Sequence, residues 1–126
     1  MSPLERRILW AVALAGLAGA CLVVFLFNPE VYHFYPVCIF HQVTGWECPG
    51  CGGLRASYQL MHGNFAAAWR FNPLVVLLAP VSAWIIAREL IRETTGKVLP
   101  GRLTQPLFAW ALVPTVILFG VLRNVW

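Results

Sequence analysis

Three long runs of apolar residues dominate the chain, and most polar residues lie between them. Residues 8–27 contain no charged side chain over twenty positions, about the length that crosses a hydrocarbon core. The second run begins at Pro73 and reaches about residue 92 if its long basic side chains snorkel to the interface. The third covers about residues 105–124. The pattern therefore predicts three transmembrane helices, at about 8–27, 73–92 and 105–124.

Local signals mark the ends of these runs. Asn28-Pro29 ends the first, because proline has no backbone N–H to donate and restricts the residue before it. Asn72 is typical of a helix N-cap and Pro73 of a first helical position. Thr104 has the corresponding capping position before the third run.

The connection between the first two spans, residues 28–72, is long for a structureless loop in so small a protein. Apolar side chains at three- and four-residue steps predict a short amphipathic helix over residues 53–61. Asn64 begins a second run, residues 65–71, which is rich in alanine and aromatic side chains. Both are too short to span, so we expect one or two interfacial or re-entrant helices that lead into the second span.

The composition agrees with a membrane protein. The chain has 126 residues, of which 60% are hydrophobic and 11% charged, compared with about 25% charged residues in an average soluble domain. We therefore expect a single all-α integral membrane domain, residues 1–126, in contact with the lipid bilayer. The net charge of +4 does not indicate nucleic-acid binding, because the basic residues flank apolar runs and form no stripe.

Lysine and arginine residues in the short connections predict the orientation of the spans. Of the nine basic residues, three would lie on the side opposite the N-terminus and six on the same side as it. The three are Arg55, Arg70 and Arg123. The N-terminus is therefore expected in the cytoplasm, and the connection 28–72 on the extracytoplasmic side.

Four potential metal ligands occur in this connection as two close pairs: Cys38 with His41, and Cys48 with Cys51. A tetrahedral structural zinc ion takes four such ligands, normally from two pairs. The six residues between the pairs are fewer than the dozen or more usual in zinc motifs. His33 and His62 are alternative fourth ligands. The pattern predicts a zinc site formed by Cys38, His41, Cys48 and Cys51.

The same cysteines allow other chemistry. An extracytoplasmic loop permits a structural disulfide, although three loop cysteines would leave one thiol unpaired, whereas a metal ion uses all three. In a redox hypothesis Cys48 and Cys51 exchange electrons with a substrate. A helix N-terminus and Arg55 are then expected to lower the pKa of Cys51. A labile metal site would instead be typical of a metal sensor or chaperone.

The spans themselves suggest a partner. None carries a central ionisable residue, the usual sign of an ion or proton pathway, which argues against a transporter acting alone. A small-residue face on the first span favours close helix contact: Ala15, Gly16, Gly19 and Ala20. The leading hypothesis is a non-enzymatic accessory subunit or assembly partner of a larger membrane complex, or a homo-oligomer. The rival hypothesis is an enzyme, a membrane thiol–disulfide oxidoreductase.

From Cys38 to Ala56 the chain follows the string C-x-x-H-x-x-T-G-x-x-C-P-G-C-G-x-x-R-A, and an Asn72-Pro73 step comes later. This string resembles the signature of a family of small bacterial membrane proteins, the domain-of-unknown-function family numbered 2752. The resemblance covers about residues 35–92 and differs at Leu54, where threonine or a similar residue is expected. It implies a multi-pass protein of the bacterial inner membrane and supplies no activity.

Overall fold

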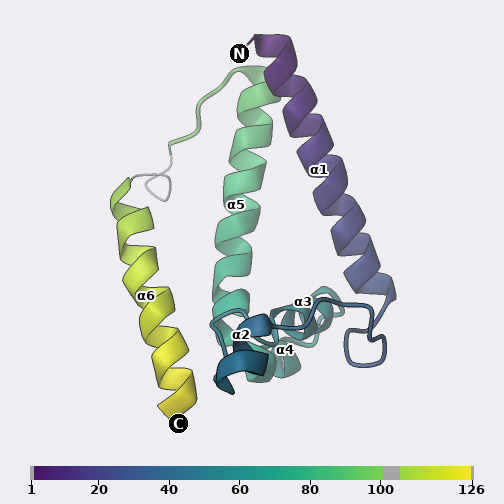
Figure 1. Cartoon of the computed structure of the whole chain (residues 1–126). Coiled ribbons are helices and arrows are strands. Elements are labelled where there is room, and N and C mark those ends of the chain that lie inside the picture. The colour runs from purple at the N-terminus through teal and green to yellow at the C-terminus, as the bar shows by residue number, and fades with distance from the viewer. Residues whose placement is uncertain (1, 101–105, 126) are drawn as a thin grey trace.

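The computed structural model describes residues 2–100 and 106–125. Three helices are long and apolar enough to cross a membrane: α1 (Pro3–Leu26), α5 (Pro73–Thr95) and α6 (Pro106–Val125). Three short helices lie together at one end of these: α2 (Ile39–Thr44), α3 (Gly53–Met61) and α4 (Phe65–Phe71). At that end α1 and α6 finish and α5 begins (Figure 1). The predicted class, an all-α protein with three spans and short helices after a cysteine loop, is confirmed.

Most helix boundaries follow the sequence signals. Helices α3 and α4 have the predicted bounds, and α5 starts at Pro73 as expected. Helix α1 begins earlier than predicted, at Pro3, because the Glu5 N–H donates to Ser2 Oγ over 3.2 Å and the Ser2 N–H donates to Glu5 Oε2 over 2.7 Å. Thr104, the predicted cap of α6, lies outside the described residues.

Helix α2 was not predicted. It has six residues, Ile-Phe-His-Gln-Val-Thr, most of which have modest helix propensity, and its N-cap residue Cys38 makes no side-chain capping bond. Gly45 ends it in the left-handed conformation, with φ of 73°. The helix shortens the path between Cys38 and Cys48, which makes the short spacer between the two ligand pairs workable.

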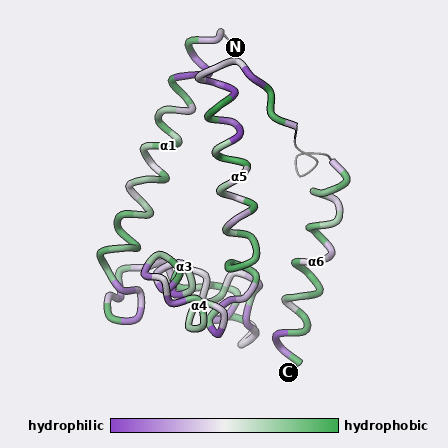
Figure 2. The backbone as a smooth tube through the Cα atoms, turned by 180° about the vertical axis from the view of Figure 1, so that it is seen from behind, coloured by the Kyte–Doolittle hydropathy of each residue, from purple (hydrophilic) through white to green (hydrophobic). Residues whose placement is uncertain are grey.

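Few side chains in the described part of the chain are buried. They are Val24, Ala56, Ala68 and Asn72, from α1, α3, α4 and the start of α5. The long helices are largely apolar, and polar residues gather towards the ends of the structure (Figure 2). The packed region therefore lies among the short helices, and most of the surface of the three spans is left for lipid or for other helices.

The end of α1 is attached to this region by aromatic side chains. Phe25 stacks on His62 with 4.5 Å between ring centroids, and His62 in turn packs 4.2 Å from Tyr58. The Tyr35 hydroxyl donates to the carbonyl oxygens of Val23 and Phe27 over 3.2 and 2.6 Å. Tyr35 thus gives the Phe27 carbonyl a partner beyond the end of α1 and adds a second hydrogen bond to the Val23 carbonyl, which also accepts the Phe27 N–H.

At the opposite end, α1 and α5 are joined by an ion pair. Arg6 Nε lies 3.0 Å from Glu93 Oε1, and the Glu93 side chain is only 8% exposed. Arg92 lies 3.8 Å from the same carboxylate oxygen. The two helices are therefore joined directly at this end, whereas at the other end α1 contacts α3.

Asn72 connects the start of α5 to the cysteine loop and is completely buried. Its Oδ1 accepts hydrogen bonds from the N–H groups of Leu74 and Val75 over 3.0 and 3.3 Å. Its Nδ2 donates to the carbonyl oxygens of Pro49 and Cys51 over 2.9 and 3.2 Å. One side chain therefore caps a transmembrane helix and fixes the turn that carries two cysteines.

We predict that Asn72→Ala destabilises the protein by about 3 kcal/mol, since a helix cap contributes about 1 kcal/mol and an unsatisfied buried carbonyl costs about 2 kcal/mol. Asn72→Asp keeps the helix cap but places a carboxylate oxygen against the two carbonyl oxygens. This variant should therefore be no more stable than Asn72→Ala. Denaturant unfolding in detergent micelles, followed by circular dichroism, measures the effect.

Asn64→Ala is the matched control. Asn64 also occupies an N-cap position, before α4, but its side chain makes no capping bond and donates only to exposed Gln59 Oε1. An Asn72→Ala variant no less stable than the Asn64→Ala variant would contradict the anchoring role of Asn72.

Candidate metal centre

The loop between α2 and α3 makes a tight turn over residues 48–53. The N–H of Cys51 donates to the Cys48 carbonyl over 3.0 Å, and the N–H of Gly53 donates to the Gly50 carbonyl over 2.9 Å. Gly52 is left-handed, with φ of 75°, and a Cβ at this position would lie 2.8 Å from the carbonyl oxygen of Phe71. Both its backbone conformation and its surroundings require glycine. We call this turn, residues 48–53, the knuckle.

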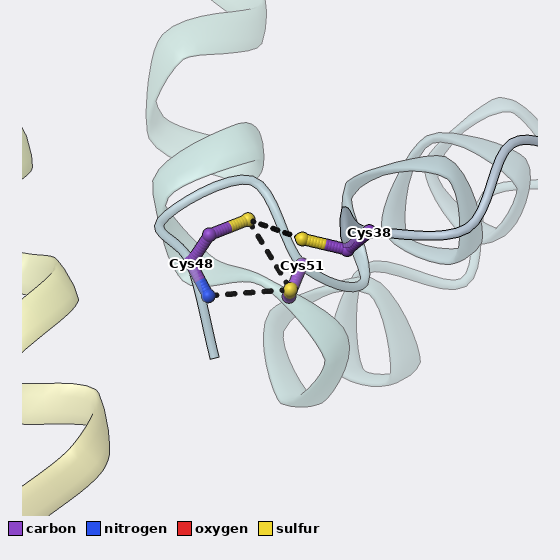
Figure 3. A group of neighbouring side chains, drawn as sticks. All are labelled: Cys38, Cys48 and Cys51. Atoms are coloured by element: carbon purple, nitrogen blue, oxygen red, sulfur yellow. Dashed lines mark hydrogen bonds between the residues drawn. The ribbon is translucent and has the colours of Figure 1, made fainter. Parts of the chain in front are cut away.

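Three sulfur atoms meet beside the knuckle (Figure 3). Cys38 Sγ lies 3.3 Å from Cys48 Sγ, which lies 3.2 Å from Cys51 Sγ. All three sulfurs lie within 4.8 Å of one another. Thiolates at the corners of a tetrahedron around zinc lie about 3.8 Å apart when the Zn–S bonds are about 2.3 Å. The three predicted cysteine ligands are therefore close enough to one another to hold one metal ion after a small outward movement of the sulfurs.

The predicted histidine ligand does not join this group. His41 lies on α2 with its Nδ1 3.3 Å from the Trp46 carbonyl oxygen. His62, one alternative, stacks on Phe25, and its Nδ1 lies 2.8 Å from the Tyr58 carbonyl oxygen. Within the described ranges, the group of side chains that could hold a metal ion consists of Cys38, Cys48 and Cys51, and His33, the other alternative, lies outside it.

The C-terminal end of α6 holds the knuckle from the other side. Arg123 pairs with the Glu47 carboxylate and donates to the carbonyls of Cys51 and Phe71 over 2.8 and 2.9 Å. Asn124 Oδ1 accepts the N–H of Glu47 over 2.8 Å, and Asn124 Nδ2 donates to the Glu47 carbonyl over the same distance. Two adjacent polar residues thus fix both the side chain and the backbone of the residue before the knuckle.

Sequence reasoning did not find this contact. Arg123 was considered only as a basic residue flanking a span, and its partner Glu47 is 76 positions away in the chain. The one local signal was a polar pair, Arg123-Asn124, at the end of an apolar run. Gly120 is the third element of the contact, since a Cβ there would lie 2.8 Å from Pro49 Cγ.

The surroundings of Cys38 and Cys51 shift their thiol pKa values in opposite directions. The N–H of His41, aided by the thiols of Cys48 and Cys51, lowers the pKa of Cys38. Burial, followed by the neighbouring thiols of Cys48 and Cys38, raises the pKa of Cys51 to about 12. The expectation that a helix N-terminus and Arg55 lower the pKa of Cys51 is therefore wrong. The Arg55 guanidinium instead lies 6.0 Å from the centroid of the Phe71 ring.

The three cysteines line a cavity of about 480 Å³. Aromatic, basic and acidic side chains complete its wall, among them Tyr32, His33, Tyr35, His41, Glu47 and Arg55. The sulfur group is therefore accessible from a space large enough to hold a small molecule or the end of a peptide.

A family model described as "Protein of unknown function (DUF2752)" matches residues 38–86. The match begins at Cys38 and includes the knuckle, α3, α4 and the first part of α5. It confirms the resemblance inferred from the C-P-G-C-G-x-x-R-A string. Comparisons with curated proteins and with solved structures found no match.

In the metal-free protein we predict that iodoacetamide modifies Cys38 well before Cys51 at neutral pH, because the thiolate is the reacting species. Between pH 7 and pH 10 the Cys51 rate should rise about tenfold per pH unit, as expected for a thiol far below its pKa. The Cys38 rate should level off within this range. Mass spectrometry of timed, quenched samples measures both rates. Faster modification of Cys51 would contradict the assignment of their pKa shifts.

Proposed function

We propose that this chain is an accessory subunit or assembly partner of a larger complex in the bacterial inner membrane. In this proposal Cys38, Cys48 and Cys51 bind one structural zinc ion. The observation that carries the metal site is the meeting of three sulfurs, from the N-cap of α2 and from the knuckle, within 4.8 Å of one another.

A metal ion accounts for this arrangement better than a disulfide. Zinc binds thiolates readily and has no geometric preference of its own that three converging sulfurs would violate. A disulfide would use two of the three cysteines and leave the third without a role. Because such a metal site does not exist in the unfolded chain, the binding energy contributes to the stability of the fold.

The distribution of basic residues supports a cytoplasmic N-terminus. Arg6 and Arg92 lie at the end of α1 and α5 that is remote from the knuckle, where the positive-inside rule places the cytoplasm. On this orientation the three cysteines are at the extracytoplasmic surface of the membrane, together with α2, α3 and α4.

The small-residue face of α1 supports the accessory role. Ala15, Gly16, Gly19 and Ala20 are all exposed, and a Cβ added at Gly16 or Gly19 would meet no other atom within 4 Å. Small residues of this kind let helix backbones approach closely in a membrane. Since the other described helices do not cover this face, we assign it to a helix of a partner protein or of a second copy.

A thiol–disulfide function is the second candidate. The 3.2 Å separation of the Cys48 and Cys51 sulfurs favours it, because little movement would be needed to form a disulfide. The raised pKa of Cys51 makes this thiol a weak nucleophile. The two candidates differ in metal content and in the number of free thiols.

We predict about one zinc ion per chain in protein purified in mild detergent without chelator or nickel resin, with the three loop thiols protected until chelator is added. Cys38→Ser, Cys48→Ser and Cys51→Ser should each lose most of the metal. Cys21→Ser is the control, since Cys21 lies on α1 outside the group. Elemental analysis and thiol titration of the same sample give both quantities. Protein without metal, and with two thiols that appear only after reduction, would establish the disulfide candidate instead.

We predict that Gly19→Leu releases the protein from its native complex, because the new side chain blocks close helix contact. Ala18→Leu is the control, since the helical repeat turns this residue away from the small-residue face. Native gel electrophoresis of mildly solubilised membranes measures the size of the complex. A complex of unchanged size with Gly19→Leu would contradict the role of this face.

A further inference from the structure

The three-cysteine group is one donor short of the four that a structural zinc ion takes. The following inference rests on the proposed metal site and concerns the fourth ligand. Three protein ligands with a fourth, exchangeable position are typical of zinc sites that react with or bind other molecules.

The best-placed donors of the chain itself do not complete the group. His41 lines the same cavity as the sulfurs, but neither of its ring nitrogens joins the three sulfurs within 4.8 Å of one another. Glu47 also lines the cavity, and its carboxylate is paired with Arg123. Using Glu47 as a metal ligand would break the contact that holds the knuckle to α6.

The cavity provides both access and space for a ligand from outside. All three cysteines are part of its wall, and its volume of about 480 Å³ lies within the range of small-molecule sites in proteins. Arg55 and His33 are also part of the wall. Besides the paired Glu47, the remaining carboxylate in the wall is that of Glu30, which is not in the group that could hold a metal ion.

We infer that the fourth coordination position opens into this cavity and takes an external thiolate. A metal held by three thiolates is a soft centre, which favours a fourth soft donor. On binding, a metal–sulfur bond forms, a metal-bound water leaves and the thiol proton passes to solvent. The thiolate comes either from a small thiol or from a cysteine side chain of another polypeptide.

Cobalt substitution tests this inference in the full-length protein. One equivalent of Co²⁺ replaces zinc, and the sample is titrated with L-cysteine and, separately, with a ten-residue Gly/Ser peptide that carries one cysteine. L-serine and the all-Gly/Ser peptide are the matched probes. We expect the sulfur-to-cobalt charge-transfer absorption to rise saturably by about one third, as three Co–S bonds become four.

The double variant His33→Ala/His41→Ala should respond in the same way, because neither imidazole is the fourth ligand. A response to L-cysteine alone assigns the site to small thiols, and a response to the peptide assigns it to a polypeptide partner. If neither thiol changes the charge-transfer absorption and the double variant no longer binds cobalt, the inference is overturned. The metal site itself would then remain. The absence of any cobalt–sulfur band would overturn both.

Discussion

The structure depends on one buried amide, that of Asn72. Its oxygen caps α5 and its nitrogen holds the carbonyls of Pro49 and Cys51. Both functions need an acceptor oxygen and a separate donor NH2 group on one short side chain. Ionised aspartate has no donor, and serine has its donor and acceptor on the same oxygen atom. Because Asn72 itself is fully buried, water has no access to either half of its side-chain amide. The start of a transmembrane helix and the position of the cysteine knuckle are therefore fixed together.

Helix α6 extends this arrangement to a second span. The Cys51 carbonyl accepts hydrogen bonds from both Asn72 and Arg123, which uses both of its lone pairs. Arg123 also binds the Phe71 carbonyl, the same atom that leaves no space for a side chain at Gly52. The knuckle is thus held by polar contacts from α5 and α6, and its shape does not depend on the sulfur atoms alone.

The sequence predicted those elements whose signals are local. The bounds of α3 and α4 and the start of α5 followed from apolar periodicity, from Asn64 and from the Asn72-Pro73 cap. The Ser2–Glu5 capping box is equally local, and it extends α1 to Pro3, beyond the start that the uncharged run predicts. The short helix α2 has no strong propensity. The Arg123–Glu47 contact joins residues far apart in the chain, and no periodic pattern could reveal it. The cysteine ligands were predictable from their spacing, whereas the orientation of His41 depends on the Trp46 carbonyl.

A metal ion bound by the three sulfurs would connect segments of the chain that are attached to different spans. Cys48 and Cys51 belong to the knuckle, which is bound to α5 and α6. Cys38 follows Tyr35, whose hydroxyl is bound to the end of α1. A metal ion held by all three cysteines would therefore join the segment anchored on α1 to the turn anchored on the other two spans. Its loss would leave the knuckle in place and release the segment of α2.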